Sequence, residues 1–182
     1  DTTLTTTNSA VSFGSTLDGT NNLTFATGTG AVTVTGAVGS NTALATILVQ
    51  DTGTVDFDST VSATSLQQLD RDADTTADGL VTLSGALAIQ EGDAILNAGL
   101  TADEVFVGIG DATDGALATA TVAGGAVLIG NGDGNIEVGL RRTGATDDLS
   151  EGTLDLSGAT GVTIDVDNIL LGTLVGFPGS QG

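Results

Sequence analysis

Short runs in which apolar and polar residues alternate recur along the whole chain, and they constrain its fold more than any other feature. Alternation with a period of two, rich in β-branched residues, is typical of a half-buried strand. Segments rich in Gly, Asn, Asp and Ser separate the runs at intervals of about 8 to 15 residues, which indicates turns between strands. No long segment has helical periodicity, so the sequence predicts an all-β protein. The runs are residues 11–13, 23–25, 32–34, 47–49, 55–57, 80–83, 105–107, 126–129, 136–138, 154–156 and 162–166.

The composition favours one β architecture over another. Sandwiches and barrels usually bury large aromatic side chains, and this chain has five Phe with no Trp or Tyr. Narrow β-solenoids stack short aliphatic strands and place Gly, Asn and Asp at tight corners, and the chain has 28 Gly. We therefore predict a right-handed parallel β-helix (β-solenoid), with an antiparallel β-sandwich as the alternative. The length suits a single all-β domain over residues 1–182, repeat-like over 11–61 and less regular after 62.

Charge and missing residue types exclude several function classes. The chain has 23 Asp and Glu against three Arg, for a net charge of −20. This argues against nucleic acid and anionic membranes as partners, because both require a cationic surface. Without His, Cys or Lys there is no Ser-His-Asp triad, no thiol nucleophile, no Schiff base and no zinc site built from His and Cys. We predict that the protein is not an enzyme.

An internal repeat occupies the first third of the chain. The segment 11–14 leads through Asp18-Gly19 to 23–25, and the segment 30–39 follows. This pattern resembles the strand repeats of very large bacterial surface proteins, the filamentous-haemagglutinin-like and autotransporter-like adhesins. The resemblance covers residues 11–61, and it implies a right-handed parallel β-helix exported to the cell surface or matrix.

Several features point outside the cell. A chain without Cys is compatible with an oxidising environment, where free thiols are a liability. The most apolar segment, residues 169–177, is far shorter than the roughly 18 residues of a membrane span, so no membrane insertion is expected. The chain starts at Asp1 without a basic segment, which predicts a removed signal peptide or a piece of a longer protein.

These observations lead to two functional hypotheses. The first is a structural or adhesive extracellular or cell-surface β protein, a subunit or segment of a filament or matrix. Its partners would be copies of itself in a fibre, or another surface protein. The alternative is a carbohydrate-binding or carbohydrate-active β-helix module with a glycan as its ligand.

One acidic segment has the spacing of a calcium loop. Asp70, Asp72, Asp74 and Asp78 stand at positions 1, 3, 5 and 9 of an EF-hand-type loop, and Thr76 would supply a carbonyl at position 7. Ca²⁺ requires six to eight oxygen ligands, which a curled backbone could direct to one point. Departures from the pattern are the lack of Gly at the sharp turn and of Glu at the last position. An acidic, solvated loop between strands is the alternative interpretation.

Three further acidic segments are candidates for binding or chemistry. Residues 130–136 are similar to the Gly/Asp nonapeptide that binds calcium in parallel β-rolls, although a turn that needs positive φ explains them equally well. The pairs Asp56/Asp58 and Asp165/Asp167 lie on one side of predicted strands, as carboxylates that hydrolyse glycosides could. Aspartates on one face also arise by chance in a chain this acidic.

Overall fold

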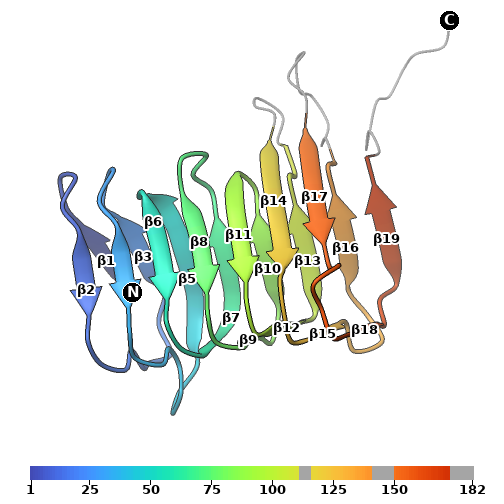
Figure 1. Cartoon of the computed structure of the whole chain (residues 1–182), viewed down its shortest axis with the longest axis horizontal. Coiled ribbons are helices and arrows are strands. Elements are labelled where there is room, and N and C mark those ends of the chain that lie inside the picture. The colour runs from blue at the N-terminus through green and yellow to red at the C-terminus, as the bar shows by residue number, and fades with distance from the viewer. Residues whose placement is uncertain (111–115, 141–149, 173–182) are drawn as a thin grey trace, which may run out of the picture.

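The protein consists of stacked β-strands. The computed structural model describes residues 1–110, 116–140 and 150–172, and within them it contains nineteen strands in two sheets and no helix (Figure 1). None of the described residues therefore forms a helix that could span a membrane. The twelve-stranded sheet consists of β1 (Thr2–Thr5), β3 (Leu23–Ala26), β5 (Leu44–Asp51), β7 (Val61–Gln68), β9 (Val81–Leu83), β10 (Ala86–Ile89), β12 (Gly99–Ala102), β13 (Glu104–Val107), β15 (Ala126–Ile129), β16 (Asn135–Val138), β18 (Gly161–Ile164) and β19 (Asn168–Leu171). The seven-stranded sheet consists of β2 (Val11–Phe13), β4 (Val32–Val34), β6 (Thr54–Phe57), β8 (Asp74–Ala77), β11 (Gly92–Leu96), β14 (Leu117–Val122) and β17 (Glu151–Asp155).

All strand pairs within the described residues are parallel. The seven strands of the smaller sheet stack side by side in chain order, from β2 to β17. The larger sheet divides at β7, whose first half pairs with β9 and whose second half pairs with β10. From there β9, β12, β15 and β18 form one branch, and β10, β13, β16 and β19 form the other.

Both predicted architectures are wrong. The antiparallel β-sandwich is excluded because the described strand pairs are parallel. The right-handed parallel β-helix is replaced by two sheets, of which the larger is one continuous curled sheet rather than a set of separate faces. The physical reason lies in β5 and β7, which each run for eight residues. Neither strand contains the Gly, Asn or Pro that would end it at a corner, so the two branches remain joined.

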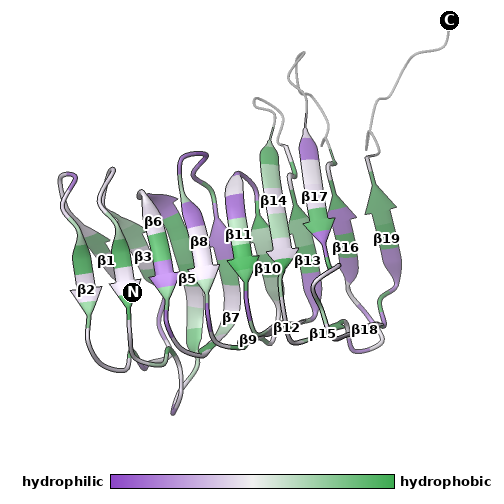
Figure 2. Cartoon of the chain, viewed as in Figure 1, coloured by the Kyte–Doolittle hydropathy of each residue, from purple (hydrophilic) through white to green (hydrophobic). Residues whose placement is uncertain are grey.

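Aliphatic side chains in register form the core between the sheets. Leu66, Leu87, Val105 and Ile136 occupy matching positions on β7, β10, β13 and β16, and none is more than 2% exposed. Figure 2 shows hydrophobic and hydrophilic residues alternating along many of the strands. Each buried aliphatic side chain contributes about 1.5–3 kcal/mol relative to an exposed one. The core is thus a series of ladders in which each strand covers the previous one.

One buried polar group interrupts these aliphatic ladders. Gln68, at the end of β7, is fully buried, and its Nε2 donates to the carbonyl oxygens of Ala73 (2.8 Å) and Glu91 (2.7 Å). Its Oε1 accepts a hydrogen bond of 2.6 Å from the Thr75 hydroxyl, which is also buried. Gly92 closes the arrangement at φ +74°, where a Cβ would meet the carbonyl oxygen of Ala73 and the Gln68 amide. The amide therefore ties together three successive segments of chain.

We expect Gln68→Leu to lower the free energy of unfolding by about 2–3 kcal/mol, because the buried Thr75 hydroxyl and two carbonyls lose their partner. Urea denaturation measures this. Gln67→Leu is the matched control, since Gln67 is the half-buried neighbour. Equal losses in the two variants would contradict a specific role for the Gln68 amide.

Candidate functional site

The five predicted calcium ligands lie in strand β8 and in the residues that flank it on both sides. Asp70 lies just before the turn that leads into β8, and its carboxylate accepts hydrogen bonds from the backbone N–H groups of Thr52 (2.9 Å) and Asp72 (3.0 Å). Asp74 and Thr76 belong to β8, and Asp78 follows its last residue. A strand rises about 3.3 Å per residue, so β8 separates Asp78 from the turn by more than 10 Å.

The residues that alternate with the aspartates explain why this segment is extended. Ala73, Thr75 and Ala77 face inward and are buried, and they alternate with the aspartates. The Thr75 hydroxyl donates a hydrogen bond to the Gln68 side chain. Strand β8 also pairs with β6 on one side and with β11 on the other. The aspartate spacing predicted a curled loop, but the small buried residues between the aspartates favour a strand instead.

Three carboxylates from two strands meet on the outer face of the smaller sheet. Asp56 lies in β6, Asp58 follows it, and Asp78 follows β8. Phe57 pairs with Ala77 in the sheet, which places Asp58 beside Asp78. One carboxylate oxygen from each of the three aspartates lies within 4.8 Å of the others. We call Asp56, Asp58 and Asp78 the carboxylate cluster.

Electrostatic repulsion in the cluster is only partly offset. Partial burial, followed by the charges of Asp58 and Asp78, raises the pKa of the Asp56 carboxyl above its ordinary value. The Asn97 side chain donates a 2.7 Å hydrogen bond to Asp78. The ion pair seen among the described residues joins Arg71 to Glu91 and does not involve the cluster. The remaining arginines, Arg141 and Arg142, lie outside the described residues.

The chemistry available to the cluster is that of a hard-cation ligand set. Three carboxylates supply part of the six to eight oxygens that Ca²⁺ takes, and water could supply the others. The sequence predicts Asp56 and Asp58 as a pair and Asp78 as part of a different site. The sequence signal for the cluster is the separation of about twenty residues between Asp58 and Asp78. Paired residues of the neighbouring strands β6 and β8 have the same separation in sequence.

The other acidic candidates do not converge in the same way. Residues 130–134 turn between β15 and β16 with positive φ at Gly130, Gly132 and Gly134, and the Asn131 amide donates to Asp103 (3.2 Å). These angles match the alternative of a turn that needs glycine. Asp165 and Asp167 are exposed and belong to no group of three acidic side chains among the described residues.

Three of the five phenylalanines pack together inside the molecule. The rings of Phe13, Phe25 and Phe57 pack in a row inside the molecule, with centroids 6.5 Å apart in each tilted pair. Phe25 and Phe57 are at most 1% exposed. These three rings therefore serve the core and offer no platform on which a sugar could stack.

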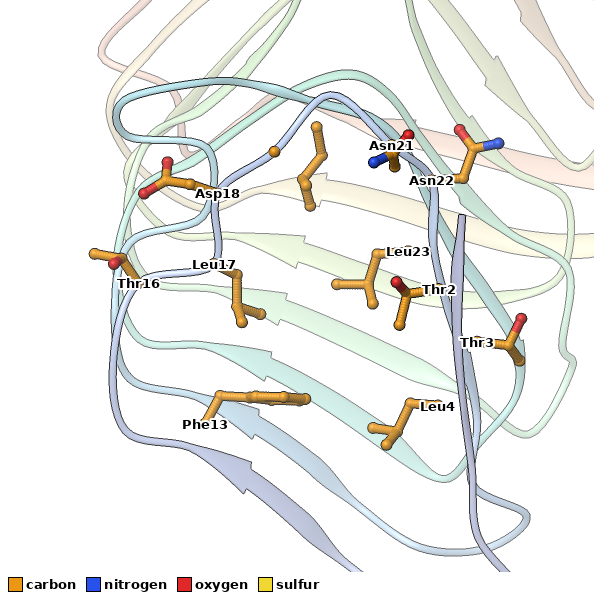
Figure 3. Close-up of a pocket in the computed structure, with 12 residues that line it drawn as sticks. Thr2, Thr3, Leu4, Phe13, Thr16, Leu17, Asp18, Asn21, Asn22 and Leu23 are labelled. Carbon is orange, nitrogen blue, oxygen red and sulfur yellow. The ribbon is translucent and has the colours of Figure 1, made fainter.

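A cavity opens at the end of the stack that holds β1 and β2. Its volume is about 390 Å³, and Leu4, Phe13, Leu17 and Leu23 line it together with Leu44 (Figure 3). The first four are half-buried and pack on the core. The cavity is the unfilled end of the hydrophobic interior, and none of the three cluster aspartates lines it.

Comparisons with protein-family models, with curated proteins and with solved structures find no match to this chain.

The raised pKa of Asp56 predicts the direction of a pH effect. Because the folded chain holds this proton more tightly than the unfolded chain, stability falls as pH rises from the ordinary pKa of Asp through the raised one. We expect Asp56→Asn to raise the melting temperature at pH 7 and to flatten the pH dependence in that window. Asp165→Asn, an equal charge change at an exposed position, is the control and should have a smaller effect.

Calcium binding remains a prediction, and two double variants distinguish its possible locations. We expect saturating Ca²⁺ to raise thermal stability, by about 2.7 kcal/mol at 100 times its dissociation constant. Asp58→Asn with Asp78→Asn should abolish this response, and Asp72→Asn with Asp74→Asn should preserve it, because within the described part of the chain it is the cluster that brings three carboxylates together. The opposite pattern would assign the effect to the Asp70–Asp78 segment. An equal response to NaCl at matched ionic strength would show screening alone.

Proposed function

We propose that the protein is a structural or adhesive component of the cell surface or extracellular matrix, a subunit or segment of a filament that forms by self-association. The observation that carries this proposal is that, among the described residues, apolar side chains that continue the core are half-buried or exposed at both ends of the stack. At one end the cavity beside β1 and β2 is open. At the other end the last described strands of the larger sheet leave their inward-facing side chains exposed.

The uncovered residues at the second end continue the buried ladders. Val162 and Ile164 of β18 pair with Val127 and Ile129 of β15. The β15 residues are at most 2% exposed, whereas Val162 and Ile164 are 45% and 40% exposed. The same side-chain positions are thus buried when a strand covers them and open when none does. A further strand layer would bury them at about 25 cal/mol per Å² of apolar surface.

The backbone supports the same conclusion. Within the described residues β1 pairs with β3 alone and β2 with β4 alone, and at the other end β17 pairs with β14 alone and β18 with β15 alone. An edge strand presents N–H and C=O groups to which another chain can bind. The extracellular location rests on the resemblance of residues 11–61 to surface-protein repeats and on the absence of Cys.

Self-association is tested by sedimentation and electron microscopy of the purified chain over a range of concentration and salt. We expect species larger than the 17.7 kDa monomer, and we expect added NaCl to promote them because it screens repulsion between chains of charge −20. A monodisperse monomer under all of these conditions would contradict the proposal.

A further inference from the structure

The turn between β15 and β16 contains a dipeptide that can react with itself. Asn131 precedes Gly132, and no other asparagine in the sequence precedes a glycine. We propose that Asn131-Gly132 is a site of spontaneous deamidation, which converts the asparagine into aspartate or isoaspartate, and that two hydrogen bonds to neighbouring turns restrain the reaction. This chemistry goes beyond the proposed function and does not depend on it.

The reaction joins two groups of the same dipeptide. The Gly132 nitrogen attacks Cγ of Asn131 and forms a five-membered succinimide, while the bond between Cγ and Nδ2 breaks. The proton lost by the Gly132 nitrogen leaves with Nδ2 as ammonia. Water then opens the ring at either carbonyl, which gives aspartate or isoaspartate at position 131. Because the nucleophile and the carbonyl carbon are covalently connected, the first step is unimolecular and water is the co-reactant of the second.

The steric surroundings of the dipeptide favour this reaction. Asn131 and Gly132 are both exposed, so water reaches them. A Cβ added to Gly132 would meet no atom within 4 Å, and without a Cβ no side chain hinders the approach of the Gly132 nitrogen to Cγ. The φ of Gly132 is +103°, a conformation that other residues rarely adopt. The turn therefore requires the same glycine that makes the preceding asparagine reactive.

Two hydrogen bonds hold the reacting groups to different neighbours. The Asn131 side-chain amide donates to the carboxylate of Asp103 (3.2 Å), and the Gly132 N–H donates to the carbonyl oxygen of Asp165 (3.1 Å). Asp103 follows β12 and Asp165 follows β18, the two strands that pair with β15. The nitrogen must give up its hydrogen bond to Asp165 before it can attack. We therefore expect the folded chain to react more slowly than the unfolded chain.

The product would change the contacts of this turn. A carboxylate at position 131 would lie beside the Asp103 carboxylate, where an amide now donates a hydrogen bond. Isoaspartate also adds a methylene group to the main chain, which would displace the Gly132 nitrogen from Asp165. The turn connects β15 in one branch of the larger sheet with β16 in the other. Deamidation would therefore weaken the packing of this turn on both of its neighbours.

Peptide mapping by mass spectrometry tests the site in the folded full-length chain, incubated at mildly alkaline pH. Asn97 is the internal control, because it is exposed, its amide also donates to an aspartate (Asp78, 2.7 Å), and Ala98 follows it. We expect Asn131 to deamidate at least about tenfold faster than Asn97, which corresponds to a barrier lower by about 1.4 kcal/mol. Both aspartate and isoaspartate should appear at position 131. Equal rates at the two asparagines would overturn the proposal.

The restraint is tested by changing the acceptor. Asp103→Ala removes the oxygen that holds the Asn131 amide, whereas Asp103→Asn retains a side-chain oxygen at the same position. We expect deamidation of Asn131 to accelerate in Asp103→Ala, to stay near the unmodified rate in Asp103→Asn, and to be fastest in denaturing urea. Circular dichroism establishes that each variant is folded, and the urea comparison decides if Asp103→Ala is not. An equal rate in the native chain and in urea would show that the fold does not restrain the site.

Discussion

The stacking of inward-facing aliphatic side chains in parallel register is the interaction on which the rest of this structure depends. The chain has few aromatic residues and no disulfide or metal-binding Cys and His. Its interior is built from ladders such as Leu66–Leu87–Val105–Ile136, in which each strand buries the side chains of the previous one. Stability therefore accumulates along the stack. The same dependence leaves the first and last described strands with apolar side chains that no further strand covers.

Local hydrogen bonding determines what each aspartate contributes to this highly charged molecule. Asp18 accepts backbone and side-chain hydrogen bonds, and the pKa of its carboxyl is lowered. Asp56 lies beside two other carboxylates and is partly buried, and the pKa of its carboxyl is raised. One carboxylate thus stabilises a turn in its charged form, whereas the other is destabilising when charged. A net charge of −20 does not act uniformly, because Asp18 is satisfied by hydrogen bonds whereas Asp56 lies beside two other carboxylates.

Much of the local structure follows from residue patterns. The alternating runs at residues 11–13, 32–34 and 126–129 are strands β2, β4 and β15, because alternation and β-branched residues fit a half-buried strand. The arrangement of the strands into sheets is harder to predict from the sequence than the strands themselves. The uninterrupted strands β5 and β7 hold two branches in one curled sheet, and whether a strand bends or continues depends on its neighbours as well as its residues. Around β8, the aspartate spacing predicts a loop, although Ala73, Thr75 and Ala77 alternate with polar residues as the inward-facing residues of a strand do.

In the strands that alternation identifies, the sequence by itself determined which side chains face inward, since in a strand successive residues point to opposite sides. It also determined that the chain lacks imidazole, thiol and amine groups for chemistry. Only the tertiary structure decided which carboxylates meet. Asp56 and Asp58 join Asp78 because β6 and β8 are neighbours in register, whereas Asp70 and Asp78, closer in sequence, are held apart by the extended strand between them. Proximity in this fold is set by the pairing of strands about twenty residues apart, and that pairing depends on the whole stack.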